Sequence, residues 1–160
     1  MLSVHILCVG KLKEKFYAEA VAEYQKRLGG YCKLQILELA EERLPQDPSR
    51  AQIDAALKKE AEAIRSKIPQ GASVVAMCIE GQERSSEELA KLLDSWGQSG
   101  GKCLCFLIGG SYGLDEGLKR EAWVRLSMSP MTFPHHLARV MLLEQLYRGF
   151  KINEGSKYHK

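Results

Sequence analysis

Five short apolar runs alternate with five amphipathic segments along this chain of 160 residues. The runs are apolar almost throughout, as expected of strands that are covered on both faces. They lie at residues 3–10, 33–40, 73–81, 102–110 and 124–129. Strands of this kind that alternate with helices predict an α/β fold with a mostly parallel sheet flanked by helices.

The segments between these runs carry recognisable helix signals. Ser49 with Gln52, and Ser85 with Glu88, have the spacing of capping boxes, and Asp115 stands where a helix cap is expected. A last helix is predicted over 136–152, where apolar residues occupy nearly every side. In so short a chain, a helix with apolar residues on nearly every side suggests a dimer interface as well as a core contact. Without repeats or linkers, residues 1–160 are expected to form one domain.

Composition narrows the classes of function without selecting one. The net charge of +3 and the pI of about 8.6 are compatible with a nucleic-acid partner but do not require one. The first apolar run is too short for a signal peptide, and no run approaches the roughly 18 apolar residues of a transmembrane helix. We therefore expect a cytoplasmic protein with no membrane contact. The five cysteines lack metal-ligand spacing, so we expect reduced core thiols and no metal.

A glycine-rich turn, Gly109-Gly110-x-x-Gly113, follows the fourth run and precedes a helical segment. A dinucleotide-binding fingerprint would need GxGxxG after the first strand, and a P-loop would need GxxxxGK[ST]. Neither pattern is present, which disfavours a phosphate cradle. Two interpretations remain: a tight turn that needs glycine for its own backbone, or a turn that lets a ligand approach closely.

Three strand ends are expected to meet at one edge of the sheet: Glu80-Gly81, Gly109-Gly110 and the run Met128–Phe133. Ligands of open α/β sheets bind at the carboxyl ends of the strands. The third segment alternates small polar with apolar residues and contains Pro130. It could line a pocket for a flat, partly apolar ligand such as adenine, or it could be a plain connecting loop.

Polar residues of the last helix and the tail are candidates for chemistry and for RNA contact. His135 stands at the helix start, where the positive end of the helix dipole favours a neutral imidazole that can act as a base. Alternatively it only packs or caps. Arg148, Lys151 and the terminal residues 158–160 could bind a nucleic-acid backbone and stacked bases, or form a solvated basic tail.

These motifs together resemble the RlmH family, which are 23S ribosomal RNA (pseudouridine-N3) methyltransferases of the SPOUT, or α/β-knot, class. The matching stretches are FLIGGSYGL, LSMSPMTFPHHLARVMLLEQLYRGFKI and the terminal YHK, with a similar opening, ILCVGKLKEKFYAEAVAEYQKRL. IGGxxG alone is weakly specific. Combined with TFPHxxxR, ExxYR and the terminal Tyr-His, it is highly specific, and the likeness covers essentially the whole chain.

The resemblance implies an S-adenosylmethionine (SAM) site in a C-terminal trefoil knot, within a homodimer. Carried onto this sequence, the cofactor contacts fall at Met77, Gly109, Met128, Ser129, Pro130, Met131, Thr132 and Phe133, and we expect Gly110 beside them. These are the three strand ends described above. The family commonly has leucine at the position of Met77, a change between apolar side chains of similar volume.

The implied reaction is methylation of N3 of a pseudouridine in 23S ribosomal RNA, on the ribosome. We expect His135 to remove the N3 proton or to orient the base, and Arg139 to stabilise negative charge that develops on a base oxygen. Tyr158, His159 and Lys160, from either subunit, would close over the base, with Arg148 and Lys151 on phosphates. The alternatives are a non-enzymatic nucleotide- or RNA-binding module and a SPOUT methyltransferase that acts on transfer RNA.

Overall fold

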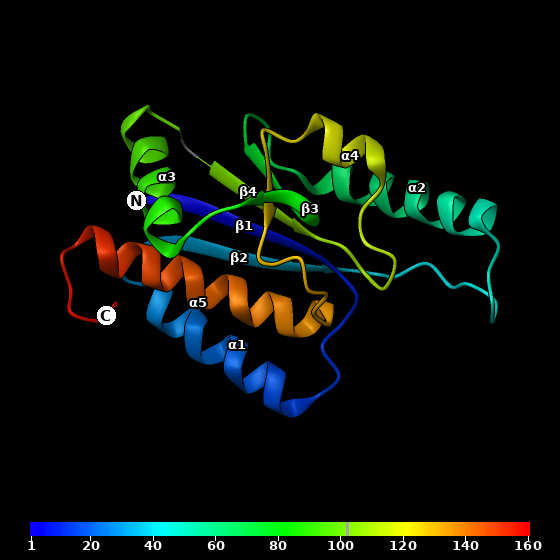
Figure 1. Ribbon diagram of the computed structural model, residues 1–160, viewed down its shortest axis with the longest axis horizontal. Helices are drawn as coiled ribbons and strands as arrows, with labels where there is room; N and C mark the ends of the chain where they lie inside the picture. The colour runs from blue at the N-terminus through cyan, green and yellow to red at the C-terminus, as the bar shows by residue number, and fades with distance from the viewer. Residues whose placement is uncertain (102) are drawn as a thin grey trace.

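The computed structural model describes residues 1–101 and 103–160 and contains one five-stranded sheet with helices on both faces (Figure 1). The strand order is β2-β1-β4-β3-β5, and every neighbouring pair is parallel. Lys102, the first residue of the fourth predicted run, lies outside the described residues. The strands are β1 (Leu2–Val9), β2 (Cys32–Leu39), β3 (Ser73–Glu83), β4 (Cys103–Ile108) and β5 (Val124–Ser127). The predicted parallel α/β sheet is confirmed.

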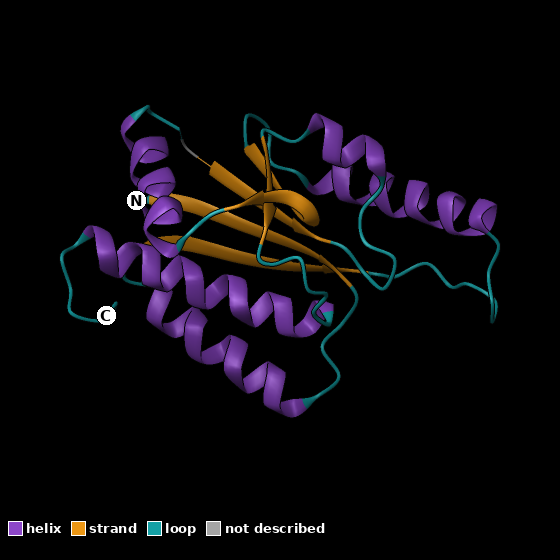
Figure 2. Ribbon diagram, viewed as in Figure 1, coloured by secondary structure: helices purple, strands orange, loops and turns teal. Residues whose placement is uncertain are grey.

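A helix follows every strand of the sheet, as the alternating pattern predicted. Helices α1, α3 and α5 cover one face, and α2 and α4 cover the other (Figure 2). Their bounds are α1 (Lys15–Leu28), α2 (Arg50–Lys67), α3 (Ser86–Gln98), α4 (Glu116–Glu121) and α5 (His135–Asn153). Parallel strands need such crossover connections, so the sheet and its helices require each other.

The central strands divide their side chains between two cores. Along β1, Ile6 and Cys8 join the core under α1, α3 and α5, whereas Leu7 and Val9 join the core under α2 and α4. Successive side chains of a strand point to opposite faces, so one apolar run supplies both cores. All six residues of β4 are buried, which explains its continuous apolar sequence.

The three predicted helix starts are confirmed by hydrogen bonds. In the first box, Ser49 Oγ accepts from Gln52 N at 3.2 Å, and Gln52 Oε1 accepts from Ser49 N at 2.9 Å. The box of Ser85 and Glu88 repeats this geometry at 3.1 and 2.7 Å. The carboxylate of Asp115 accepts from the N–H group of residue 117 at 2.9 Å. These bonds fix where the helices begin after each strand or loop.

The second half of β3 curls around β5. Leu126 of β5 is the register partner of both Met77 and Gln82, so β3 passes β5 twice. Gly81 stands in this curl, and a Cβ atom placed there would lie 2.8 Å from the carbonyl carbon of Arg125. Only glycine permits this close approach of two backbones. The curl brings the end of β3 over the start of the loop that follows β5.

Helix α5 lies between α1 and α3 over the middle of the sheet (Figure 1). Leu142, Leu143 and Leu146 are completely buried, and none of residues 135–152 is fully exposed. Burial of this helix on several sides, which the apolar pattern predicted, is therefore confirmed. The first turn of α5 starts directly at the pocket described below.

Candidate functional site

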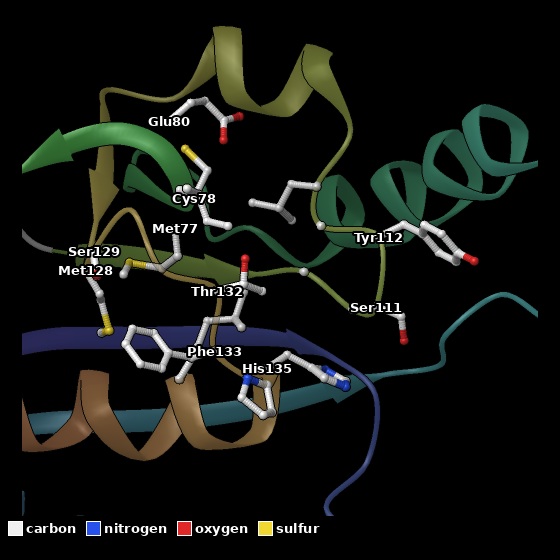
Figure 3. Close-up of a pocket in the computed structure, with 18 of the residues that line it drawn as sticks. Met77, Cys78, Glu80, Ser111, Tyr112, Met128, Ser129, Thr132, Phe133 and His135 are labelled. Atoms are coloured by element: carbon white, nitrogen blue, oxygen red, sulfur yellow. The ribbon is translucent and has the colours of Figure 1, made fainter. Parts of the chain in front are cut away.

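A pocket of about 750 Å³ opens at the carboxyl ends of β3, β4 and β5 (Figure 3). Its walls are the curl of β3, the glycine turn after β4, the loop 128–134 and the first residue of α5. The three strand ends therefore meet, as the sequence predicted. Of the residues proposed to bind the cofactor, the pocket is lined by Met77, Gly109, Gly110, Met128, Ser129, Met131, Thr132 and Phe133. Pro130 belongs to the same loop but is not among the lining residues.

The inner part of the pocket is apolar. Ile108, Leu114 and Leu126 join the predicted methionines and Phe133 in its walls. Ile108 and Leu126 fall in predicted strands and Leu114 in no predicted element, so the sequence did not indicate their place in the pocket. A volume of this size and an apolar lining with few polar groups suit a nucleoside-sized ligand.

Close packing around the turn after β4 requires glycine at positions 109 and 110. A Cβ atom on Gly109 would lie 2.3 Å from the carbonyl carbon of Gly113, and one on Gly110 would lie 2.6 Å from Oε1 of Glu41. Gly113 has φ of +79°, and Gly110 and Gly113 form an isolated bridge. The two glycines are thus explained by the turn and by Glu41. Close approach of a ligand, which we had also expected, is not needed to explain them.

Glu41 holds this turn from outside the pocket. Its Oε1 accepts a hydrogen bond from the Ser111 N–H at 2.8 Å, across 70 positions of sequence. The next residue, Glu42, is held in turn because its N–H donates to Oε2 of Glu60 at 2.9 Å. Glu60 is buried, and burial raises the pKa of its carboxyl group. The irregular segment after β2 therefore supports the glycine turn from behind the pocket wall, which no sequence motif indicated.

The loop between β5 and α5 is held by serine side chains. Ser129 Oγ accepts from the Met131 N–H at 3.0 Å, and the carbonyl of Ser129 accepts from Ser127 Oγ at 3.1 Å. Met131 is 73% exposed at the rim. Both the hydroxyl and the carbonyl of Ser129 are therefore used within the loop.

His135 stands at the pocket wall with a defined hydrogen-bond partner. Its Nδ1 lies 3.2 Å from the carbonyl oxygen of Val9. A carbonyl oxygen only accepts, so Nδ1 carries the proton, and in the neutral ring Nε2 keeps its lone pair. His136 stacks on His135 with ring centroids 4.2 Å apart. This is the geometry of a histidine that can accept a proton at Nε2.

Arg139 does not reach the pocket, which corrects the role predicted for it. The residue is 2% exposed, Nη1 donates to Oε2 of Glu38 at 2.7 Å, and Nη2 donates to the carbonyl of Gly10 at 3.1 Å. Both partners lie at the ends of β1 and β2. Nη1 and Nη2 of the buried guanidinium tie these ends to α5. Spacing put Arg139 one turn after His135, but its side chain contacts the ends of β1 and β2, and Arg139 is not among the residues that line the pocket.

The far end of α5 and the tail form a second polar cluster. Nη2 of Arg148 donates to Oε1 of Glu144 at 2.7 Å, and the hydroxyl of Tyr158 donates to the same atom at 3.1 Å. Nη1 of Arg148 contacts Nδ1 of His159 at 3.1 Å, and Nε2 of His159 contacts Glu87 at 2.7 Å. Sequence reasoning selected Arg148, Tyr158 and His159 but missed Glu144, the acceptor that joins them.

Lys151 and Lys160 were also predicted to contact RNA. Nζ of Lys151 donates to Glu154 at 2.6 Å and to the Tyr31 hydroxyl at 3.1 Å, contacts that raise the pKa of Lys151. Lys160 is exposed at the chain end. Neither residue lines the pocket.

The tail cluster and the pocket lie at opposite ends of α5 (Figure 1). His135 and Arg148 are 13 positions apart, which is about 20 Å along a helix at 1.5 Å per residue. Within one chain the structure therefore does not bring the tail residues to the pocket.

Comparison with known proteins identifies the family. A family model described as "Predicted SPOUT methyltransferase" matches residues 2–159. The chain belongs to the SPOUT methyltransferase family.

Individual SPOUT relatives match this chain along its whole length. Proteins named "Ribosomal RNA large subunit methyltransferase H" from Clostridium beijerinckii and Bacillus pumilus are 45% and 46% identical to it, over 99% of this chain and 100% of theirs. A solved structure of a probable methylase family protein from Haemophilus influenzae Rd KW20 has a similar fold. It matches with a TM-score of 0.53 and 14% identity, covering 98% of this chain and 68% of that one.

The SPOUT pocket also carries charge on its rim. Lys119 of α4 contacts Glu80 and Glu116, and its hydrogen bond lowers the pKa of Glu80. Burial opposes protonation of Lys119, but its two carboxylate partners raise its pKa above the ordinary value. Lys119 was not selected from the sequence, because a lysine in a short helix carries no motif.

Residues 1–101 and 103–160 contain no group of three or more His, Cys, Asp or Glu side chains arranged to hold a metal ion. Within the same residues, no helix has both the length and the apolar character needed to cross a membrane.

Burial raises the pKa of the Cys8 thiol to about 11 and that of the Cys105 thiol to about 12. Both thiols are therefore inert as nucleophiles.

Proposed function

We propose that this chain transfers a methyl group from SAM to N3 of a pseudouridine in 23S ribosomal RNA, on the ribosome and therefore in the cytoplasm. The observation that carries the proposal is the full-length match to relatives named as large-subunit ribosomal RNA methyltransferases, in a chain of the SPOUT family. The pseudouridine and its N3 atom come from the family resemblance of the TFPHxxxR, ExxYR and terminal Tyr-His motifs.

The residues of the pocket fit SAM. The apolar wall of Met77, Leu126 and Met128 suits the adenine ring, and the backbone of 128–133 is available for its polar edge. Gly109, Gly110, Thr132 and Phe133 would enclose the remainder. Bound there, SAM supplies an electrophilic methyl group. The curl of β3 around β5 supports the further proposal that the C-terminal half forms a trefoil knot around this pocket.

His135 is proposed as the group that handles the substrate proton. N3 of pseudouridine is an imide nitrogen, so its N–H proton must leave when the N–CH₃ bond forms at the expense of the S–CH₃ bond of SAM, with S-adenosylhomocysteine as the leaving group. With Nδ1 donating to Val9 O, Nε2 is the atom that would accept this proton or orient the base. No covalent enzyme nucleophile is needed, and most of the barrier lowering would come from positioning.

The tail is proposed to act on the partner's pocket in a homodimer. Within one chain, about 20 Å of helix separates the tail cluster from His135. A second subunit whose α5 runs in the opposite direction would bring its Tyr158, His159 and Lys160 over the substrate base, with Arg148 and Lys151 on phosphates. The partly exposed flank of α5 supports such a contact.

Calorimetry with SAM and a tritium-methyl assay on three RNAs test the proposal. We expect SAM binding and label transfer to ribosomes, with little transfer to free ribosomal RNA or transfer RNA. Label on transfer RNA would indicate the alternative SPOUT activity. Ligand or RNA binding without any methyl transfer would indicate a non-enzymatic module and would contradict the proposed function.

A further inference from the structure

The segment 11–17 comprises the end of the β1–α1 connection and the first three residues of α1, and it lies beside the start of α5. The Leu12 N–H donates to Oε2 of Glu38 at 2.9 Å, and Glu14 lies 3.5 Å from Nδ1 of His136. The preceding Gly10 touches both histidines, since a Cβ atom there would lie 3.0 Å from Cε1 of His135. The segment therefore has a fixed position beside His135.

Four aromatic rings lead from the protein surface to the pocket wall. The ring centroids of Phe16 and Tyr17 are 4.4 Å apart, those of Tyr17 and His136 are 6.2 Å apart, and those of His136 and His135 are 4.2 Å apart. At the outer end, Phe16 is 63% exposed. A large apolar ring that is exposed to water is the form of side chain on which nucleic-acid bases stack.

Three exposed lysines surround the outer ring. Within the described residues, Lys11 and Lys13 form no ion pair, and Lys15 has only a 3.8 Å contact with Glu19. Both members of that pair are largely exposed, so it contributes little and a phosphate can replace it. Three lysines in five positions favour a polyanion. They disfavour a second copy of this chain, because the cores of protein interfaces are depleted of lysine.

We infer that Phe16, with Lys11, Lys13 and Lys15, forms a docking surface for the single-stranded RNA that flanks the target nucleotide. The inference rests on the proposed function for its substrate. A flanking base stacks on Phe16, and the lysines contact the phosphates on either side. The ring series sets the direction of the strand, from the surface at Phe16 toward His135 in the pocket.

Binding of fluorescein-labelled oligo(U) RNA to the full-length protein tests this surface directly. Phe16→Ala should weaken binding about tenfold, while Phe16→Trp should keep near wild-type affinity, since the stacking face is restored. A variant with glutamine at 11, 13 and 15 should bind more weakly, and its salt dependence should fall in slope by about 2. As matched controls, Trp123→Ala removes an exposed ring elsewhere, and the Lys58→Gln/Lys59→Gln variant removes exposed charges on α2.

Kinetics on large ribosomal subunits separate docking from chemistry. Phe16→Ala should raise the KM for the subunits with kcat, SAM affinity and molecular mass in light scattering unchanged. Wild-type affinity in Phe16→Ala, no oligo(U) binding by the wild type, or loss of dimer mass in the variant would each overturn the inference. A wild-type protein that methylates no RNA would instead contradict the proposed function, so the two failures are distinguishable.

Discussion

At the scale of single residues, neighbours decide what a polar side chain can do. His135 and Arg139 are one helical turn apart, and the sequence suggested one role shared between them. The structure gives His135 a place at the pocket and gives Arg139 a buried ion pair with Glu38. Arg139 is therefore a positioning residue. It holds the carbonyl of Gly10, which lies between Val9, the hydrogen-bond partner of His135, and the segment 11–17.

His135→Ala should lower the rate of methyl transfer about 100-fold or more, since general-base assistance of this kind contributes roughly 10²–10⁴-fold. SAM affinity measured by calorimetry should stay close to that of the wild type. Methyl transfer at a near wild-type rate would rule out the role proposed for His135.

Arg139→Met should lower the free energy of unfolding by about 2–3 kcal/mol, because it leaves Glu38 and the Gly10 carbonyl without their donor. Burial opposes ionisation of Glu38, but Arg139 and the Leu12 N–H hold its pKa below the ordinary 4.5. A lowered carboxyl pKa stabilises the fold above pH 4.5, and this contribution is lost as pH falls through the folded-state pKa.

Urea unfolding at several pH values checks this account of Arg139. The difference in the free energy of unfolding between wild type and Arg139→Met should be constant above about pH 5.5 and should shrink below pH 4.5. A difference in free energy that does not change with pH would show that Arg139→Met loses stability through packing and not through the ion pair.

At the scale of elements, the sequence predicted what depends on neighbours in the chain. Apolar runs and the Ser49 and Ser85 capping boxes placed strands and helix starts, because these signals act over a few residues. Contacts across the sheet could not be predicted in this way. Glu41 reaches Ser111 and Arg139 reaches Glu38 only because the order β2-β1-β4-β3-β5 brings distant segments together.

Glu41→Ala should weaken SAM binding about tenfold, since a hydrogen bond to a charged group contributes about 1.5 kcal/mol or more. The reason is that the Ser111 N–H loses the acceptor that holds the glycine turn. Glu41→Gln keeps an acceptor oxygen and should recover most of the affinity. Glu42→Ala is the control, because the structure uses only its backbone N–H. Equal SAM affinities in Glu41→Ala and Glu42→Ala would contradict the supporting role of Glu41.

At the scale of the whole molecule, one chain holds a pocket and a polar tail cluster that are too far apart to act together. The pocket and the segment 11–17 lie at the start of α5. The tail cluster of Arg148, Tyr158 and His159 lies at its end (Figure 1). The sequence motifs indicated both clusters, but the distance between them follows only from the three-dimensional structure. That distance supports a dimer in which each pocket uses the partner's tail.

Mixed dimers test the exchange of tails. Deletion of residues 158–160 should abolish methyl transfer and spare SAM binding, and His135→Ala should also be nearly inactive. If each tail serves the partner's pocket, mixing the two variants creates dimers with one intact site, and part of the activity should return. If mixing restores nothing although mixed dimers form, each tail does not serve its partner.

Mapping of the transferred methyl group tests the central claim most directly. Ribosomes are incubated with the protein and tritiated SAM, and the 23S ribosomal RNA is digested to nucleosides for mass spectrometry. We predict a single labelled product, N3-methylpseudouridine, whose rate of formation is strongly reduced with His135→Ala. Label in any other nucleoside, in transfer RNA only, or in no RNA at all would contradict it.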